Sequence, residues 1–314
     1  MVKKLLISRG GASELRNTVT EKMGRGTELT RSLKNHFNKL HSLNYWDDKG
    51  VETLLLQQKK YEVSLLGKRP DYPSGYPRFS PSGSDKCSRE LFFKVLRMEQ
   101  DEQQMSPFQR RWVLNSTGVH EARQRDLLYG EIKLKNPDWH VERMDCEDAP
   151  LRHGLPAWEK NVQTHKVIEH KGTKFVVFGM MDGILKYKDG SRIGFEFKTK
   201  SNSVAQVNER QLKEAGKSHR LQCVAYSILF GLDEFIITYE AVAKDKWSTG
   251  EHGREDMRFF YVKVTEKQRQ DLLDKWTEVA VNSNDGEMPF GDNGKCLFCT
   301  FKTTCSKFTG GIVA

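Results

Sequence analysis

The sequence predicts an α/β protein in which helices flank a mixed central sheet. The first observation is helical spacing of apolar residues in the N-terminal half, at 28–43, 51–67, 84–100 and 106–131. The second is a change of pattern at about residue 162, where segments rich in Val, Ile and Phe indicate strands at 162–170, 173–187 and 192–200. The third is a helix at 207–231, ended by Gly231, and then two strands and a helix at 234–243, 257–264 and 266–283. A helix between strands is typical of an α/β core.

The pattern of the N-terminal part indicates helices, and we identify no catalytic or ligand-binding motif in it. A Pro-, Gly- and Ser-rich stretch at 68–84 indicates a loop and a boundary. We therefore expect a helical region at 1–75 and a second unit at 76–314. The stretch leads into the helix at 84–100, for which Ser84 is the expected N-cap and Cys87 lies in the first turn.

Composition narrows the class of protein. The chain has 314 residues, 37% of them apolar, and a net charge of +9. The charge fits either an ordinary basic protein or one that binds a polyanion such as nucleic acid. The start of the chain has only a brief apolar run, too short for a signal peptide or a membrane span. We expect a soluble cytoplasmic protein that does not interact with membranes, in which clustered thiols bind metal rather than each other.

Two carboxylates and a lysine are expected to converge within the strands. Glu196 and Lys198 alternate along one strand and therefore share a face, with Phe197 on the other. The turn KDG at 188–190 suits a three-residue hairpin loop, and in that register Asp182 lies opposite Glu196. A two-residue loop would turn Asp182 to the wrong face.

This trio suits metal-dependent hydrolysis of a phosphodiester. Two adjacent carboxylates repel each other unless a cation lies between them, and oxygen ligands select Mg²⁺ or Mn²⁺. Such an ion activates water, and a nearby lysine can orient that water or neutralise charge developing on phosphate. The alternative is an exposed charged hairpin that contains an ion pair.

Three further side chains lie in helices on either side of the strands. His120 follows STGV in the helix at 106–131, and Gln222 and Tyr226 stand at i and i+4 in the helix at 207–231. Each is usually a packing or surface residue by itself. Their order along the chain, taken together with Asp182, Glu196 and Lys198, is more informative than any one of them.

The order resembles the PD-(D/E)XK nuclease superfamily, and more narrowly its RecB-type exonuclease branch. The matching segments are GVH, GMMDG, EFK and QCVAY, which contain His120, Asp182, Glu196 with Lys198, and Gln222 with Tyr226. The resemblance implies a restriction-endonuclease-like core. It implies that Asp182, Glu196, the Phe197 carbonyl and His120 bind the divalent metal, and the imidazole would favour Mn²⁺. It also implies that Lys198 positions the attacking water and that Gln222 and Tyr226 hold the lysine and the DNA backbone.

Half of the six cysteines stand near the end of the chain. Cys296, Cys299 and Cys305 have the spacing C-x2-C-x5-C, and a tetrahedral site needs a fourth ligand. The chain resembles the subgroup that includes the CRISPR-associated nuclease and the AddB nuclease domain, in which one upstream and three downstream cysteines ligate a [4Fe-4S] cluster. That resemblance assigns the fourth position to Cys87, and a structural Zn²⁺ site is the alternative.

The resulting hypothesis is a metal-dependent DNA exonuclease that acts on single-stranded ends in recombination, repair or replication. A prokaryotic or phage-infected cell and a helicase or recombination partner fit this hypothesis. Two alternatives remain: a catalytically weak DNA-binding scaffold and a structure-specific endonuclease. Degenerate relatives usually lose the Asp, Glu or Lys, whereas this chain has all three.

Overall fold

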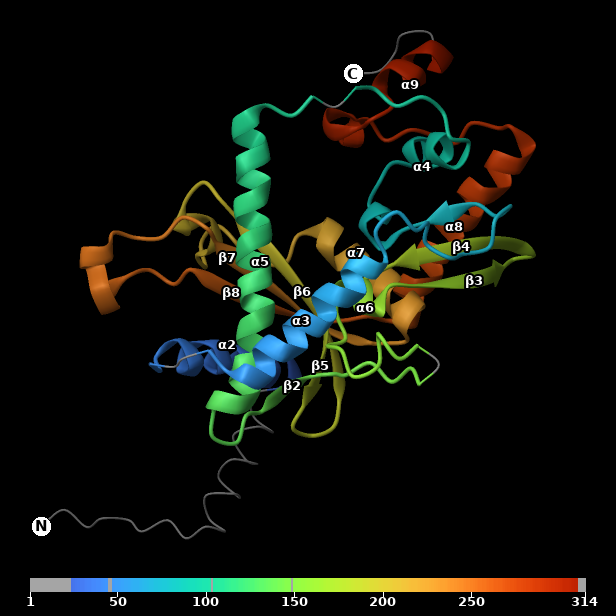
Figure 1. Cartoon of the computed structure of the whole chain (residues 1–314). Coiled ribbons are helices and arrows are strands. Elements are labelled where there is room, and N and C mark those ends of the chain that lie inside the picture. The colour runs from blue at the N-terminus through green and yellow to red at the C-terminus, as the bar shows by residue number, and fades with distance from the viewer. Residues whose placement is uncertain (1–23, 45–46, 103, 148, 310–314) are drawn as a thin grey trace, which may run out of the picture.

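The computed structural model describes residues 24–44, 47–102, 104–147 and 149–309. The chain forms two mixed sheets with helices around them, which confirms the expected α/β class (Figure 1). The expectations for the first 23 residues, including the absence of a leader segment, lie outside the described residues. None of the described helices is long and apolar enough to cross a membrane.

The larger sheet has five strands and carries the chemistry. Its order is β2 (Trp139–Val141), β5 (Gly183–Tyr187), β6 (Arg192–Lys200), β7 (Glu234–Ala241) and β8 (Met257–Lys263). Only β6 and β7 run parallel among these pairs, and α7 (Lys217–Phe230) lies between them in the chain. Neighbouring side chains of a strand point to opposite faces of the sheet. In β7, Phe235 therefore packs in one apolar cluster and Ile236 in the other.

The second sheet has three strands and corrects one expectation. Its order is β1 (Arg78–Phe79), β4 (Thr173–Gly179) and β3 (Thr164–His170). The single strand expected at 173–187 is wrong, since β4 and β5 belong to different sheets. The chain leaves β4 at Gly179, where a Cβ would lie 2.6 Å from the Pro81 ring. This close approach lets the chain turn into the five-stranded sheet directly before Asp182.

Two N-terminal helices confirm the helical reading of the described residues there. They are α2 (Arg25–His41) and α3 (Lys49–Ser64). The apolar stripe of α2 is fully buried and consists of Leu29, Leu33, Phe37 and Leu40. It packs in one cluster with residues of β5 to β7, so this helix contributes to the core beside the sheet.

Two helices begin later than expected. The helix α4 (Ser88–Val95) has Cys87 as its N-cap, and the expected cap, Ser84, instead donates to the Pro81 carbonyl at 2.7 Å. Pro81 starts a short 3-10 turn, η1 (Pro81–Gly83), and Ser84 ends that turn instead of starting the helix. The helix α7 starts at Lys217 rather than at 207, because residues 204–207 form a 3-10 turn, η2, and Gly216 is the cap.

The longest helix, α5 (Pro107–Lys133), begins with a capping box at Ser106 and stands upright across the molecule (Figure 1). Further elements are α6 (Glu159–Val162), η3 (Trp247–His252), α8 (Glu266–Asp285), η4 (Asn293–Phe298) and α9 (Lys302–Thr309). The C-terminal α9 lies near α4, where the rings of Phe93 and Phe308 have centroids 5.8 Å apart.

Candidate active site

The hairpin between β5 and β6 has the predicted register. Gly190 has φ of 87° in the three-residue loop, the Tyr187 N–H donates to the Ser191 carbonyl at 2.9 Å, and Gly183 pairs with Phe195. One residue before that pair, the Asp182 carboxylate accepts the Phe197 N–H at 2.8 Å. The side chain thus replaces a backbone partner where β5 has ended.

Asp182 is held from two directions. Gln124 of α5 donates to its carbonyl at 2.9 Å, while Phe197 fixes its carboxylate. Burial acts to raise the pKa of Asp182, but His120, Lys198 and the Phe197 N–H outweigh it and hold that pKa below its usual value. The carboxyl group is therefore ionised at neutral pH, which is the form in which a carboxylate binds a metal ion.

Glu196 is a fully buried carboxylate beside this anion. Burial and the Asp182 charge raise the pKa of Glu196 to about 7. The Lys198 ammonium forms an ion pair with one of its oxygens, and the Tyr226 hydroxyl lies beside the carboxylate. Two acids this close together in a buried place repel each other, and a metal cation between them would relieve that repulsion.

Lys198 lies on the same face as Glu196, as the alternation predicts, and Phe197 faces the other way. Burial acts to lower the pKa of Lys198, but the charges of Glu196 and Asp182 outweigh it and keep that pKa above its usual value. The side chain is a cation. Phe197 stacks on the His120 ring, with centroids 5.5 Å apart.

His120 joins Asp182 to an acid that the sequence analysis missed. Its Nε2 lies 3.5 Å from Asp182 Oδ2, and its Nδ1 lies 3.3 Å from Glu159 Oε1. One ligand atom from each of these three residues lies within 4.8 Å of the other two, so they could hold a metal ion. Burial and the Asp182 charge raise the pKa of Glu159 to about 7.

Glu159 begins the short helix α6, and nothing near it in sequence marks it as functional. Its φ of 46° is unusual for a residue with a side chain, and its N–H donates to the Met181 carbonyl at 2.7 Å. That bond ties it to the residue before Asp182. A strained backbone at such a place is typical of functional sites.

The remaining predicted residues lie on α7, on the side of the sheet to which Glu196 points. Gln222 Nε2 donates to the Tyr226 hydroxyl at 2.7 Å, and Tyr226 is buried. Burial and the Glu196 charge raise the pKa of Tyr226 well above its usual value, so the hydroxyl stays protonated beside the acid. The structure thus places Tyr226 near Glu196. The roles of both residues toward lysine and DNA, and that of the Phe197 carbonyl toward a metal, stay predictions.

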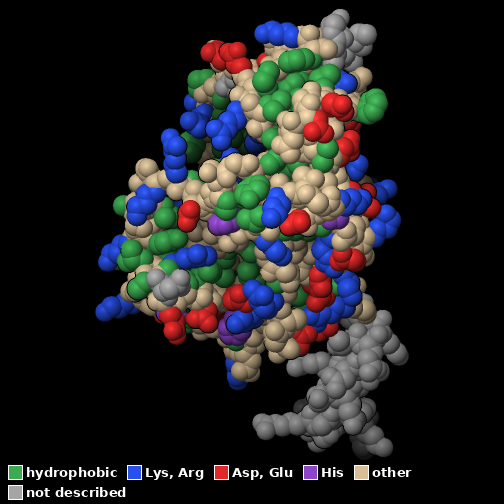
Figure 2. Space-filling model, turned by 90° about the vertical axis from the view of Figure 1, so that its right-hand side faces the viewer, with side chains coloured by type: hydrophobic (Ala, Val, Ile, Leu, Met, Phe, Trp, Pro, Cys, Tyr) green, Lys and Arg blue, Asp and Glu red, His purple; other side chains and the backbone are tan. Residues whose placement is uncertain are grey.

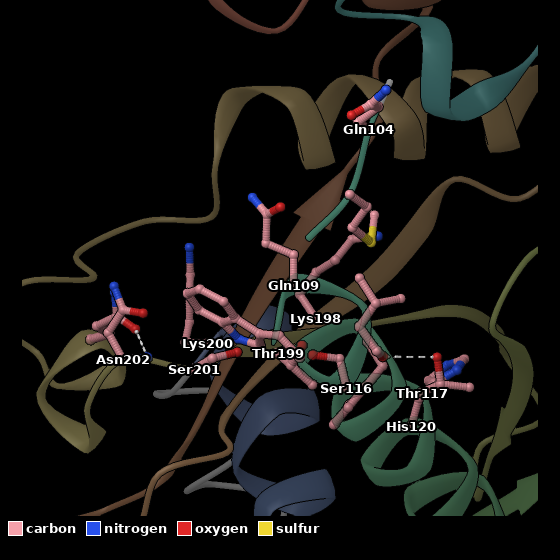
Figure 3. Close-up of a pocket in the computed structure, with 15 residues that line it drawn as sticks. Gln104, Gln109, Ser116, Thr117, His120, Lys198, Thr199, Lys200, Ser201 and Asn202 are labelled. Carbon is pink, nitrogen blue, oxygen red and sulfur yellow. Dashed lines mark hydrogen bonds between the residues drawn. The ribbon is translucent and has the colours of Figure 1, made fainter. Parts of the chain in front are cut away.

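Two cavities meet at His120. One, of about 840 Å³, lies between α5, the end of β6 and η2, and Lys198 and His120 are among its lining residues (Figure 3). The other, of about 860 Å³, lies on the side of Glu159 and is bounded by α3 and Trp158. Figure 2 shows Lys and Arg side chains gathering around a hollow in the upper part of the surface.

The four predicted cluster cysteines line one small cavity of about 20 Å³. They come from the start of α4, from η4 and its end, and from α9: Cys87, Cys296, Cys299 and Cys305. Among the described residues, no group of three ligands within 4.8 Å includes a cysteine, so the sulfurs do not approach as ligands of one ion would. Burial and the nearby Cys87 and Cys305 raise the pKa of Cys296.

Comparison with known proteins assigns the chain to a family through one family model. No curated protein matches the chain. The solved structures that resemble it include SSO0001 (13% identity, 84% of this chain and 98% of that chain, TM-score 0.44) and an alkaline exonuclease from Laribacter hongkongensis (8%, 67% and 90%, 0.40). A putative exonuclease from Eubacterium rectale has 14% identity over 75% of this chain and 94% of that chain, with a TM-score of 0.33. A model of the PD-(D/E)XK nuclease superfamily matches residues 91–306, a span that contains every predicted catalytic residue, and the chain therefore belongs to that superfamily.

Proposed function

We propose that the protein is a divalent-metal-dependent exonuclease that hydrolyses DNA from single-stranded ends. The observation that carries this proposal is the buried Glu196 beside the anionic Asp182, with Lys198 and His120 at the same point. The net charge of +9 suits a polyanionic substrate.

The donor set fits Mg²⁺ or Mn²⁺. Asp182 and His120 would hold the ion together with Glu159, and Glu196 would face it from β6. A bound ion of this kind would lower the pKa of a water molecule and stabilise charge on the phosphate. The Phe197 N–H keeps the Asp182 carboxylate oriented before any ion arrives.

Lys198 has the position and charge to act on the substrate. Its ammonium, paired with Glu196, can donate a hydrogen bond to the attacking water and keep it next to the phosphorus. The same cation opposes the negative charge that develops as the phosphate is attacked. Gln222 and Tyr226 support the site next to Glu196. Gln222 donates to the Tyr226 hydroxyl, and that hydroxyl lies against Glu196.

The position of α3 supports a requirement for ends. Gln58 of α3 accepts the Trp158 N–H at 2.8 Å, so this helix is fixed next to α6 and bounds the cavity beyond the metal ligands. A strand that enters on the Lys198 side meets this wall past the scissile phosphate. We expect this helix to hinder the passage of a continuous strand and to admit a strand end.

The test compares linear and covalently closed circular single strands of one sequence, with Mg²⁺ or Mn²⁺. Linear DNA is expected to be degraded and circles to resist, and a chelator should stop the reaction. Asp182→Asn keeps an acceptor for the Phe197 N–H but loses the charge, so it should bind DNA without cleaving it. Equal rates on circles and linear strands would identify an endonuclease, and full activity in Asp182→Asn would refute the site.

We further propose that the four cysteines hold one [4Fe-4S] cluster that ties α9 to α4. Four thiols that share a cavity are the donor set of such a cluster, and their sulfurs lie farther apart than ligands of one zinc ion. The Asp292 N–H already donates to the Cys87 sulfur at 3.2 Å.

Protein purified without air is expected to be brown and to contain iron and sulfide. Cys299→Ser should lose both and unfold at a lower temperature, whereas Cys146→Ser should keep them, because Cys146 does not line the cavity. Colourless protein with one zinc ion would replace the cluster by the alternative site. Protein with neither metal would refute both.

A further inference from the structure

The cavity on the Lys198 side has two chemically different walls. The α5 wall presents large apolar side chains that remain exposed: Met105 just before the helix at 52%, Trp112 at 41% and Val113 at 46%. The opposite wall, from the end of β6 to η2, presents Lys198 and Lys200 with hydroxyl and amide groups between them (Figure 3).

The charge of this cavity suits an anion. None of the described residues that line it is an Asp or a Glu. The segment of α5 from Ser106 to His120 contains two arginines and no acid. The cavity on the other side of His120 differs, because Glu62, Glu121 and Asp126 are among its lining residues. A polyanion is therefore favoured on the Lys198 side.

A ligand that contacts both walls would combine apolar faces with negative charge. A single nucleic acid strand has this structure, since bases stack on aromatic side chains while phosphates contact lysine. In a duplex the base faces are already covered by neighbouring bases. An aromatic ring at this place therefore distinguishes single strands from duplexes.

We propose that Trp112 is a stacking platform for the bases of a single DNA strand and that Lys200 and Lys198 hold its phosphates on the way to the metal ligands. This inference rests on the proposed function and names the form of the substrate that the site accepts. Trp112 acts in binding and specificity and lies apart from the hydrolytic groups.

The test measures binding of oligothymidylate and of a duplex to metal-free protein, so that no cleavage intervenes. Trp112→Ala should weaken binding of the single strand by roughly ten- to hundredfold and leave duplex binding nearly unchanged. Trp112→Phe keeps an aromatic face and should recover most of the affinity. Quenching of tryptophan fluorescence by the oligonucleotide should decrease in Trp112→Ala.

Trp247→Ala is the matched control, because Trp247 is fully exposed in η3 and does not line the cavity. Its affinity for the single strand should equal that of the parent protein. Equal affinity of Trp112→Ala and the parent would overturn the platform, as would equal weakening of single-strand and duplex binding.

Cleavage is measured separately, with Mn²⁺ added. A protein that binds single strands through Trp112 but cleaves nothing would refute the nuclease proposal and keep the platform. A protein that cleaves ends equally well with and without the Trp112 ring would refute the platform and keep the nuclease proposal.

Discussion

Glu159 and Asp182 show which single residues a sequence can reveal. The pairing of Asp182 with Glu196 followed from a local signal, the KDG turn, which fixes every residue of the hairpin. Glu159 has no such signal, because its place depends on a backbone hydrogen bond to Met181, 22 positions farther along the chain. Its approach to His120 arises only in the folded chain.

Glu159→Gln should weaken Mn²⁺ binding and Mn²⁺-dependent cleavage by roughly 10- to 100-fold. The amide keeps the size of the side chain and the same backbone, but loses the charge 3.3 Å from His120. Titration calorimetry with Mn²⁺ measures the affinity. Glu121→Gln, an exposed residue of α5 that lines the same cavity, is the control and should bind Mn²⁺ normally. Unchanged Mn²⁺ affinity in Glu159→Gln would show that this acid lies near the metal site without binding the ion.

Mn²⁺ should also stabilise the folded chain through Asp182. A ligand present at 100 times its dissociation constant adds about 2.7 kcal/mol to the free energy of unfolding. Thermal unfolding with and without Mn²⁺ should show this gain in the parent protein and little of it in Asp182→Asn. Equal gains in both proteins would mean that the ion binds elsewhere.

Among the elements, α5 combines two different environments. Its residues from Pro107 to Asn115 are exposed, whereas Gln124 and the stretch from Asp126 to Gly130 are buried. Gly130 lies so close to α2 that a Cβ there would stand 1.9 Å from His36 Nε2, while a Cβ at Gly118 would meet nothing within 4 Å. One helix thus contains a glycine required by packing and another that is not.

Gly130→Ala should lower the free energy of unfolding by about 1–3 kcal/mol, because the new methyl group displaces His36 or separates the helices. Gly118→Ala should instead raise it by about 1 kcal/mol or less, since alanine favours the helix and no neighbour is displaced. Urea unfolding of the two variants gives both values. A Gly130→Ala protein as stable as the parent would contradict the close approach.

The boundaries of elements were harder to predict than their existence. The chain pattern at 207–216 continued that of α7, yet the helix begins after Gly216, whose N–H donates to the Tyr239 hydroxyl at 2.9 Å. That bond comes from a strand distant in sequence. The division between β4 and β5 likewise depends on Pro81, which a local pattern of Val and Phe does not reveal.

For the fold as a unit, the docking of α2 introduces a sensitivity to acid. His36 is buried between α2 and α5, and its ring nitrogens have no hydrogen-bond partner among the described residues. Burial, with the charge of His140, lowers the pKa of His36 from 6.5 to about 4. Above pH 6.5 the ring is neutral in the folded and unfolded chain alike. Below it the unfolded chain takes up a proton that the folded chain refuses until about pH 4.

Stability should therefore decrease as the pH falls from 6.5 toward 4, by about 1.4 kcal/mol per unit and about 3 kcal/mol in total. His36→Leu cannot take up the proton, so its free energy of unfolding should decrease less over that range. Urea unfolding at several pH values measures the slope. His252→Gln, at an exposed position, should follow the parent protein. A slope that persists in His36→Leu would assign the effect to other groups.

The exposed first half of α5 has a consequence for how this nuclease can change. Substitutions at exposed positions usually alter stability by less than about 0.5 kcal/mol, so this segment can vary while the fold is maintained. The same segment borders the cavity next to Lys198. Evolution or laboratory selection could therefore exchange the residues that meet the substrate without first acquiring compensating mutations in the core, and related chains with different preferences should diverge here sooner than at the buried half of the helix.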